Sequence, residues 1–303
     1  MQNKNTKTTK TPFESYDRQT KMSWATLLTT LKDVPADFSS FFESLSLANE
    51  SFPYALITPS YEGFVHRTQP QLVCLIEDSL YVANKNESTS QALCIKFFAI
   101  HYLEFGTVLL DSNLQIKGVN QYGKWVVISL RFNTVSDGLF KKIINAIRQY
   151  PIKNFETKDD YSYENLKSAN LKMSNFTRYC ILAGEKVIHL VWQPELRKSR
   201  IKIHIPFLVN SILYQTIFPN HVTVLTDKEL ILIHETERIV HNDQYGGVWK
   251  YIPLEKIKSV GIARAQDGNL ILEIGLFDNQ KIETQYLPIL KPELEKVVEV
   301  LNL

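Results

Sequence analysis

Two stretches of the chain, residues 71–150 and 221–303, share one pattern: several short strands of alternating hydrophobicity and then one amphipathic helix. The first stretch opens with QLVCLIEDSLYV and the second with HVTVLTDKELILI. In each, an acidic turn separates two apolar strands, Glu77-Asp78 in one case and Asp227-Lys228 in the other. Because a repeated pattern of this kind marks a repeated structural unit, we predict the same small β-rich unit twice.

The length of the chain agrees with a division into two domains. Its 303 residues exceed the roughly 250 to 300 residues beyond which a single core usually splits. The polar N-terminal stretch has no apolar segment, so we expect neither a secretory signal nor a membrane anchor there. The predicted divisions are a disordered leader (1–22), a helical extension (23–50), a first domain (51–150), a linker (151–178) and a second domain (179–303).

Four apolar stripes with helical spacing are present, and turn residues separate the predicted strands. Asp111-Ser112-Asn113 is predicted to be a hairpin loop, and Gly246-Gly247 a hairpin turn. Ser23 is a candidate cap for the first helix, and Pro292 suits the first turn of the last. The stripes are Trp24, Leu27, Leu28 and Leu31; Phe38, Phe41, Phe42 and Leu45; Leu139, Ile143, Ile144 and Ile147; and Leu294, Val297, Val298 and Leu301.

The amino-acid composition indicates which cellular compartment and which kinds of partner to expect. A net charge of +2 with 22% charged residues gives no overall field that would attract nucleic acid, so no nucleic-acid partner is expected. Cys74, Cys94 and Cys180 fit no metal or redox spacing, which indicates buried thiols in a reducing compartment. The apolar run 205–219 is shorter than the roughly 20 residues that span a bilayer. We expect a cytoplasmic protein, with a location at the membrane periphery left open.

The order of motifs in the second copy resembles the pleckstrin-homology-like superfold, especially its GRAM-like and bacterial members. LTDKELILI is followed by a turn-rich loop, WKYIPLEKIKSVGI, NLILEIGL, IETQYL and a terminal helix. LIEDSLYVA, CIKFFAIHYLEF and LFKKIINAIRQY stand in the corresponding places of the first copy. The resemblance implies an α+β, mainly β fold with two open β-barrels, each closed by a C-terminal helix, and a helical extension before them. A different small barrel remains an alternative.

The resemblance also implies a possible site for anionic headgroups. Lys186, Lys198 and Arg200 follow the order of basic residues that binds phosphoinositides in the family, and Arg197 and Lys202 lie nearby. Several cations can contact phosphate oxygens, and arginine does so with two hydrogen bonds. A solvated basic turn is the alternative interpretation.

Interaction with a protein partner is the predicted function. Trp24, Phe38, Phe41 and Phe42 form a candidate interaction surface, because aromatic side chains are enriched at binding hot spots. Packing of these side chains onto the following domain is the alternative. We therefore predict a non-catalytic scaffold that binds a protein partner or itself. A peripheral membrane adaptor for anionic lipid headgroups and a metal-dependent enzyme are the alternatives.

The sequence contains no catalytic motif. GxSxG and glycine-rich phosphate loops do not occur, and the histidines, among them His189 and His204, lack HxH or HExxH spacing. We therefore predict no catalytic residue, no bound metal and no cofactor.

Overall fold

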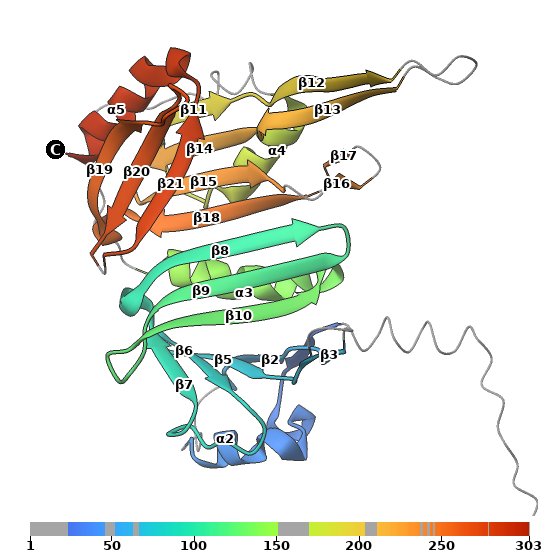
Figure 1. The fold of residues 1–303 in the computed structure, drawn as a ribbon. Helices are drawn as coiled ribbons and strands as arrows, with labels where there is room; N and C mark the ends of the chain where they lie inside the picture. Colours follow the sequence, from blue (N-terminus) through green and yellow to red (C-terminus); the bar gives the residue numbers. More distant parts are fainter. Residues whose placement is uncertain are drawn as a thin grey trace, which may run out of the picture.

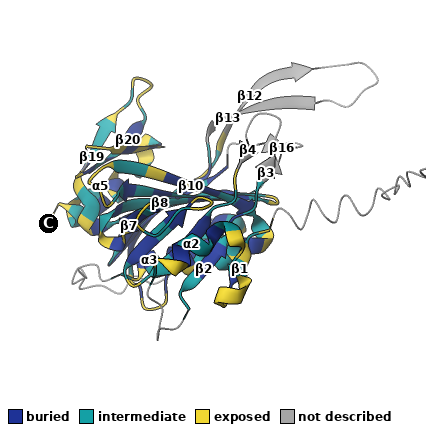
Figure 2. Cartoon of the chain, turned by 90° about the horizontal axis from the view of Figure 1, so that it is seen from below, coloured by how far each residue is buried: buried dark blue, intermediate teal, exposed yellow. Residues whose placement is uncertain are grey.

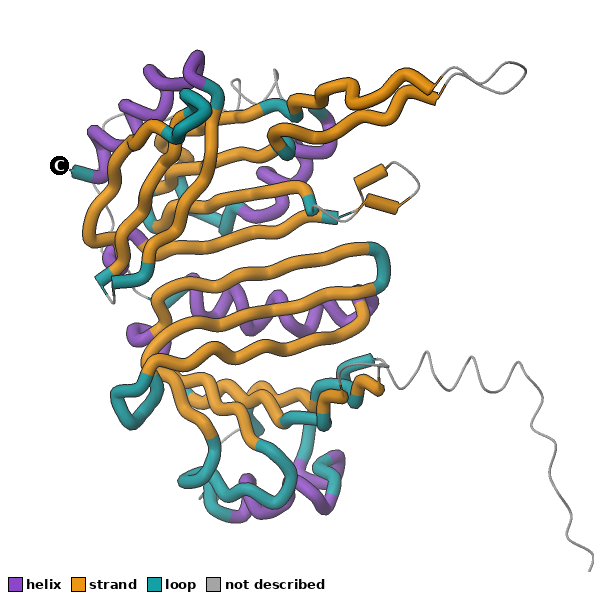
Figure 3. Tube along the Cα trace, in the orientation of Figure 1, coloured by secondary structure: helices purple, strands orange, loops and turns teal. Residues whose placement is uncertain are grey.

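The computed structural model describes residues 24–45, 52–62, 67–150, 170–203, 211–236, 239–240, 243–244, 246–277 and 279–302. The predicted leader and residues 151–169 of the predicted linker lie outside these ranges. Strands predominate over helices in the described part of the chain (Figures 1 and 3). The prediction of a mainly β fold with few helices is therefore confirmed. The sheets formed by the described residues are open, and none closes into a barrel.

Two large antiparallel sheets organise the molecule (Figure 1). The five-stranded sheet has the order β1 (Thr26–Leu28), β2 (Tyr54–Ile57), β5 (Leu72–Ile76), β6 (Ser79–Ala83) and β7 (Leu93–Lys96). The seven-stranded sheet has the order β10 (Trp125–Asn133), β9 (Asp111–Val119), β8 (Ile100–Val108), β18 (Gly247–Pro253), β15 (Glu229–Glu235), β14 (His221–Thr226) and β11 (Val187–Gln193).

Smaller sheets and a few helices complete the described fold. A three-stranded sheet contains β19 (Ile257–Arg264), β20 (Leu270–Leu276) and β21 (Lys281–Tyr286). Two-stranded sheets pair β3 (Tyr61–Glu62) with β4 (Arg67–Thr68), β12 (Leu196–Ile203) with β13 (Ser211–Phe218), and β16 (Ile239–Val240) with β17 (Asp243–Gln244). The α-helices are α2 (Ser39–Glu43), α3 (Asp137–Arg148), α4 (Leu171–Cys180) and α5 (Lys291–Leu301).

The same order of elements occurs in both halves. Four sheet neighbours, β2-β5-β6-β7 in one half and β11-β14-β15-β18 in the other, are each followed by a 3₁₀ helix, η3 (Phe97–Ala99) or η6 (Leu254–Lys256). A three-stranded meander comes next, β8-β9-β10 or β19-β20-β21. Each meander is followed by a second 3₁₀ helix, η4 (Thr134–Ser136) or η7 (Pro288–Leu290), and by α3 or α5.

The two halves share a sheet and a core. Strand β8 pairs with β18, and the register runs from Thr107 opposite Gly247 to Leu103 opposite Tyr251. The largest cluster of buried apolar side chains contains members from both halves, such as Leu56 and Ile233. Buried residues extend through the strands of the sheets (Figure 2). The two repeated segments are therefore packed directly against each other.

The predicted helix over residues 24–31 is wrong. Residues 26–28 form β1, which pairs with β2, and only the 3₁₀ turn η1 (Leu31–Asp33) follows. The helical spacing of Leu27, Leu28 and Leu31 is a coincidence, because the sheet offers backbone pairing that three residues can satisfy. The next helix is confirmed as the short pair η2 (Ala36–Phe38) and α2. Within the predicted linker, residues 171–178 belong to α4.

Candidate interaction surface

The turn between β8 and β9 exposes two leucines. Leu109 is 56% exposed and Leu110 is 65% exposed. Leu109 also has φ of 55°. This left-handed conformation costs a residue with a β-carbon about 1 to 2 kcal/mol, so tight hairpins usually place glycine, asparagine or aspartate there. An apolar and strained turn that contributes nothing to the core is a candidate site for contact with another molecule.

The short helix η4 holds this turn in place. The backbone N–H of Thr134 donates to the Leu110 carbonyl at 3.1 Å, and the Thr134 hydroxyl donates to the Leu109 carbonyl at 2.8 Å. Val135, the next residue, is 62% exposed. Three large apolar side chains are therefore presented by two segments that are tied together.

The same helix connects the turn to Trp24. At its end, the Ser136 hydroxyl accepts a hydrogen bond from the backbone N–H of Ala25 at 3.0 Å. Trp24 precedes Ala25 and is 41% exposed. We name Trp24, Leu109, Leu110 and Val135 the apolar end patch. One of the four residues predicted as an interaction surface is thus linked, through Ala25 and η4, to a turn that the sequence did not single out.

The charged residues beside the apolar end patch have mixed sign. Asp111 follows the turn directly and accepts two hydrogen bonds from the Arg131 guanidinium, at 2.8 and 2.7 Å. Asp137 follows η4 and accepts a hydrogen bond from the Ser112 hydroxyl at 2.8 Å. Burial raises the pKa of the Asp137 carboxyl above its usual value. The Lys141 ammonium also lies near Asp137, so two carboxyl groups face two cations and this border has no excess of positive charge.

The structure places the three phenylalanines of the predicted surface in a core. Phe38, Phe41 and Phe42 are at most 4% exposed. The Phe42 ring stacks on Phe52 with 5.2 Å between centroids, and Phe41 meets Tyr81 edge to face at 5.9 Å. These three side chains pack against one face of the five-stranded sheet and do not lie on a surface. A helical aromatic stripe cannot distinguish a core face from a docking face.

The residues of the predicted headgroup site lie on two elements. Lys186 is exposed in the turn before β11, where its backbone N–H donates to Asp227 Oδ1 at 2.9 Å. Arg197, Lys198, Arg200 and Lys202 belong to β12, which pairs with β13, so this segment is a strand rather than a solvated turn. The side chains of these four residues lie outside the described part of the structure. The anionic-headgroup site therefore stays a prediction.

A buried charged cluster joins the two halves. Arg148, at the end of α3, donates from Nε to Glu229 Oε1 at 2.8 Å and from a terminal nitrogen to the same oxygen. The terminal nitrogen also donates to the Cys180 carbonyl at 2.7 Å and lies 3.6 Å from Glu185 Oε2. The centre of the guanidinium lies 3.9 Å from the centroid of the Tyr251 ring. These contacts attach α3 of the first half to β15, β18 and α4.

The environment of the cluster changes the protonation of Glu229. Burial raises the pKa of the Glu229 carboxyl to about 7, Arg148 opposes this increase, and the nearby Glu185 carboxylate adds to it. A carboxyl group with such a pKa changes charge near neutral pH. Glu229 is therefore partly protonated at neutral pH, although its carboxyl group contacts Arg148.

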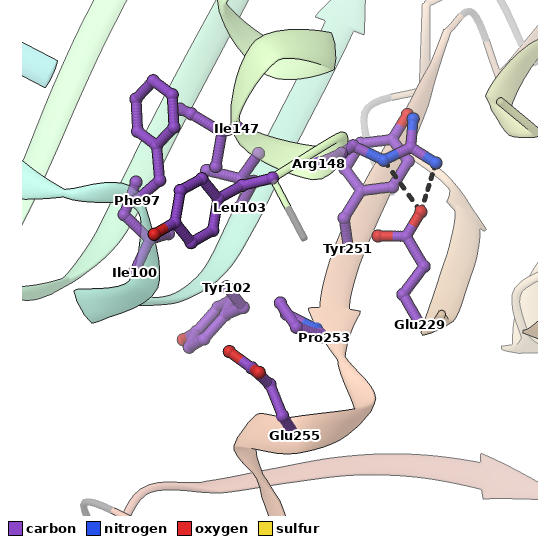
Figure 4. A pocket seen from close by; sticks show the side chains of 11 residues that line it. Phe97, Ile100, Tyr102, Leu103, Ile147, Arg148, Glu229, Tyr251, Pro253 and Glu255 are labelled. Carbon is purple, nitrogen blue, oxygen red and sulfur yellow. Dashed lines mark hydrogen bonds and ion pairs between the residues drawn. The ribbon is translucent and has the colours of Figure 1, made fainter. Parts of the chain in front are cut away.

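A pocket opens beside this cluster (Figure 4). It has an empty volume of about 360 Å³, which includes space open to solvent. The second carboxylate oxygen of Glu229, Oε2, is buried from solvent, and the Glu185 carboxyl is close enough to share a proton with Glu229. The pocket is lined by Phe97, Ile100, Tyr102, Leu103, Ile147, Arg148, Tyr150, Glu229, Tyr251, Pro253 and Glu255.

The histidines do not assemble a metal site within the described ranges. His221 and His234 stack with 5.1 Å between ring centroids, and His221 Nδ1 lies 2.9 Å from the Pro219 carbonyl. His189 Nε2 lies 3.1 Å from the Glu293 carbonyl. The described residues contain no group of three histidine, cysteine, aspartate or glutamate side chains that could hold a metal ion. His204 and His241 lie outside these residues.

No protein-family model matches the chain, and no curated protein matches it either. Within the ranges that the structure describes, no helix has both the length and the apolar character needed to cross a membrane.

Sequence reasoning missed the exposed turn for a specific reason. Asp111-Ser112-Asn113 has the composition of a loop, but these residues are the first three of β9 and pair with β8 and β10. The turn lies just before them, at two leucines. The run Val108-Leu109-Leu110 next to polar residues was the available signal. Arg148 was missed because a basic residue at a helix end is usually solvated.

Proposed function

We propose that the chain is a non-catalytic binding protein with tandem pleckstrin-homology-like domains, which acts through protein–protein interaction or self-association at the apolar end patch. The observation that carries the proposal is Leu109, a strained and exposed leucine beside the exposed Leu110. The positive φ of Leu109 costs free energy in the isolated molecule. The exposed side chains of the two leucines contribute nothing to its stability. A partner that covers the two side chains would recover the apolar burial.

The repeated order of elements supports the tandem part of this proposal. Four neighbouring strands, a three-stranded meander and a helix follow one another twice in the chain. This repeated order supports the proposal that each copy is one pleckstrin-homology-like domain. Scaffold domains of this kind present loops at the ends of their strands, and the turn at residues 109–110 is such a loop.

The charges around the apolar end patch favour a protein surface as the partner. Surfaces that bind anionic membranes combine apolar residues with an excess of lysine and arginine. The described border instead balances Asp111 and Asp137 against Arg131 and Lys141. An apolar centre with a mixed polar rim is the usual composition of a protein–protein interface.

Paired variants with a matched control test the proposal. Leu109→Asn with Leu110→Asn removes the two apolar side chains and keeps a turn that asparagine tolerates. Ile289→Asn is the control, because Ile289 is 81% exposed in η7. We expect the partner retained by the full-length protein on an affinity matrix to be lost with the double variant and kept with the control.

Sedimentation velocity of the wild type, the double variant and the control tests whether the protein associates with itself. The wild type and Ile289→Asn would form a reversible dimer at high concentration, and the double variant would remain monomeric. The proposal fails if the wild type neither associates nor retains a partner, or if the double variant behaves as the wild type does in both assays.

A further inference from the structure

The buried charged cluster between the two halves contains one base and two acids. The Glu185 and Glu229 carboxyl groups both lie beside the Arg148 guanidinium. The side chains of all three residues are at most 4% exposed. With both carboxyl groups ionised, the cluster would bury one net negative charge, which is costly without a counter-charge. One proton on the two carboxyl groups removes that charge.

The hydrogen bonds show which oxygen can carry this proton. Glu185 Oε1 accepts from the Thr226 hydroxyl at 2.7 Å, and Glu185 Oε2 accepts from the Leu182 N–H at 2.8 Å. Both hydrogen bonds of Arg148 end on Glu229 Oε1 (Figure 4). Glu229 Oε2 is buried, accepts from no donor among the described residues, and has the Glu185 carboxyl group as its neighbour. A proton on Glu229 Oε2 therefore has an acceptor in Glu185.

We propose that Glu229 and Glu185 share one proton at neutral pH, and that the loss of this proton weakens the junction between the two halves. In the protonated pair, Glu229 accepts from Arg148 with one oxygen and donates to Glu185 with the other, and the cluster is neutral. Without the proton, two carboxylates repel each other beside a single guanidinium.

The position of the cluster directs this effect to the junction. Arg148 ends α3 of the first half, whereas Glu229 begins β15 of the second half and Glu185 precedes β11. The charges that change with pH therefore hold the two halves together. This device is independent of the apolar end patch.

The direction of the pH dependence follows from the protonation of the pair. Burial raises the pKa of Glu229 from its usual 4.5 to about 7, Arg148 opposes the increase, and Glu185 adds to it. A pair that shares a proton titrates as a unit, so this value describes the pair. Between these two pH values the folded chain keeps a proton that the unfolded chain has released. The contribution to stability is therefore complete at low pH and is lost as the pH rises through about 7.

Three other groups that face the pair keep their protonation state between pH 5 and 8. Burial raises the pKa of the Cys180 thiol, from α4, and of the Tyr251 hydroxyl, from β18. Burial acts to lower the pKa of Arg148, from α3, but the neighbouring carboxyl groups raise it above its usual value. The other titratable side chains that line the adjoining pocket are Tyr102 of β8, Tyr150 after α3 and Glu255 of η6.

Urea unfolding of the full-length protein and of Glu229→Gln at pH 5 and pH 8 tests the proposal. Glutamine has the shape of the protonated carboxyl group, so its oxygen can accept from Arg148 and its NH₂ group can donate to Glu185. We expect the folding equilibrium constant of the wild type, divided by that of Glu229→Gln, to fall at least about tenfold from pH 5 to pH 8. The ratio is needed because His221 and His234, whose pKa values burial lowers, change stability in the opposite direction.

Matched variants assign the effect to the pair. Glu295→Gln removes an exposed carboxylate on α5, so the ratio of wild type to this control should stay constant with pH. Glu185→Gln leaves a single carboxyl group opposite Arg148, which needs no proton to be neutral. It should therefore lose the pH dependence as Glu229→Gln does, and it keeps the test valid if Glu229→Gln does not fold.

Amide hydrogen exchange locates the effect in the molecule. After correction for the intrinsic pH dependence of exchange, protection of the β8 and β18 amides in the wild type should fall about threefold or more from pH 6 to pH 8. Protection of the β20 and β21 amides should fall less, and neither pair of strands should change in Glu229→Gln. A ratio of folding constants that is the same at pH 5 and pH 8, or β8 and β18 protection that falls equally in the wild type and the variant, would overturn the proposal.

Discussion

Leu109 combines two features that are unusual for a leucine in the described structure: a positive φ and an exposed side chain. Its backbone adopts a conformation that suits asparagine or glycine, and its side chain lies mostly in solvent. Its neighbour Leu110 is also exposed, but its φ is not positive. Comparing the two positions therefore separates backbone strain from exposure.

Substitution of Leu109 should stabilise the fold. We expect Leu109→Asn to raise the free energy of unfolding by about 1 kcal/mol, because asparagine tolerates positive φ better than leucine. Leu110→Asn should change it by less than about 0.5 kcal/mol. Urea unfolding at constant pH measures both values, and equal effects of the two substitutions would contradict the assignment of strain to Leu109.

The stacked histidines should make stability depend on pH. Burial lowers the pKa of His221 to about 4 and that of His234 to about 3, both below the usual 6.5. Between these values and pH 6.5 the unfolded chain binds protons that the folded chain does not, so stability falls as the pH falls through this interval. We expect His234→Gln to reduce the stability difference between pH 7 and pH 5 by about 1 to 2 kcal/mol in urea titrations. An unchanged difference would show that the pKa of His234 is the same in the folded and the unfolded chain.

At the scale of elements, long amphipathic patterns were predictable and short segments were not. The stripes ending in Ile147 and Leu301 predicted helices that the structure contains as α3 and α5, because a helix of three turns repeats its apolar spacing several times. Strand β1 has three residues, so its type depends on pairing with β2, which the local sequence does not encode. The hairpin at residues 109–110 was misplaced for a similar reason, since pairing with β8 and β10 keeps Asp111-Ser112-Asn113 in a strand.

A glycine just before β18 lets the two halves approach closely. Gly246 has φ of 91°, and a β-carbon there would lie 1.8 Å from the Thr107 carbonyl oxygen of the neighbouring half. Gly184 has φ of 79°, but nothing lies within 4 Å of the corresponding position. Both glycines therefore have a positive φ, but only Gly246 lacks the space for a β-carbon.

This pair gives a matched prediction. Gly184→Ala should cost about 1 kcal/mol, which is the penalty for positive φ alone. Gly246→Ala should cost at least about 2 kcal/mol more, because a backbone carbonyl cannot move aside without disturbing the β8–β18 pairing. Thermal and urea unfolding of both variants measure the difference. Similar losses at the two positions would mean that the junction between the halves is loosely packed.

At the scale of the whole molecule, the repeat was visible in the sequence but the way its copies join was not. The order of strands and the closing helix are encoded locally in each copy, so alternation and turn residues indicate them. The β8–β18 pairing and the Arg148–Glu229 contact connect residues 81 or more positions apart. Periodicity carries no information about such contacts. The apolar end patch likewise depends on contacts between distant segments, so only Trp24 was identified from the sequence.

The shared sheet and core predict cooperative unfolding. The largest cluster of buried apolar side chains draws on both halves, so each half loses part of its core when the other unfolds. We expect calorimetry of the full-length protein to show a single transition whose van't Hoff and calorimetric enthalpies agree. Two separable transitions would indicate that the halves are independent domains in spite of the β8–β18 pairing.

Carbene footprinting of the full-length protein, purified and inside cells, tests the central claim most directly. The account predicts that labelling of Leu109, Leu110 and Val135 falls several-fold in cells relative to the purified protein at low concentration, while labelling of Ile289 and Phe277, which are also exposed, stays the same. Equal labelling of the apolar end patch in both settings would contradict its assignment as an interaction surface.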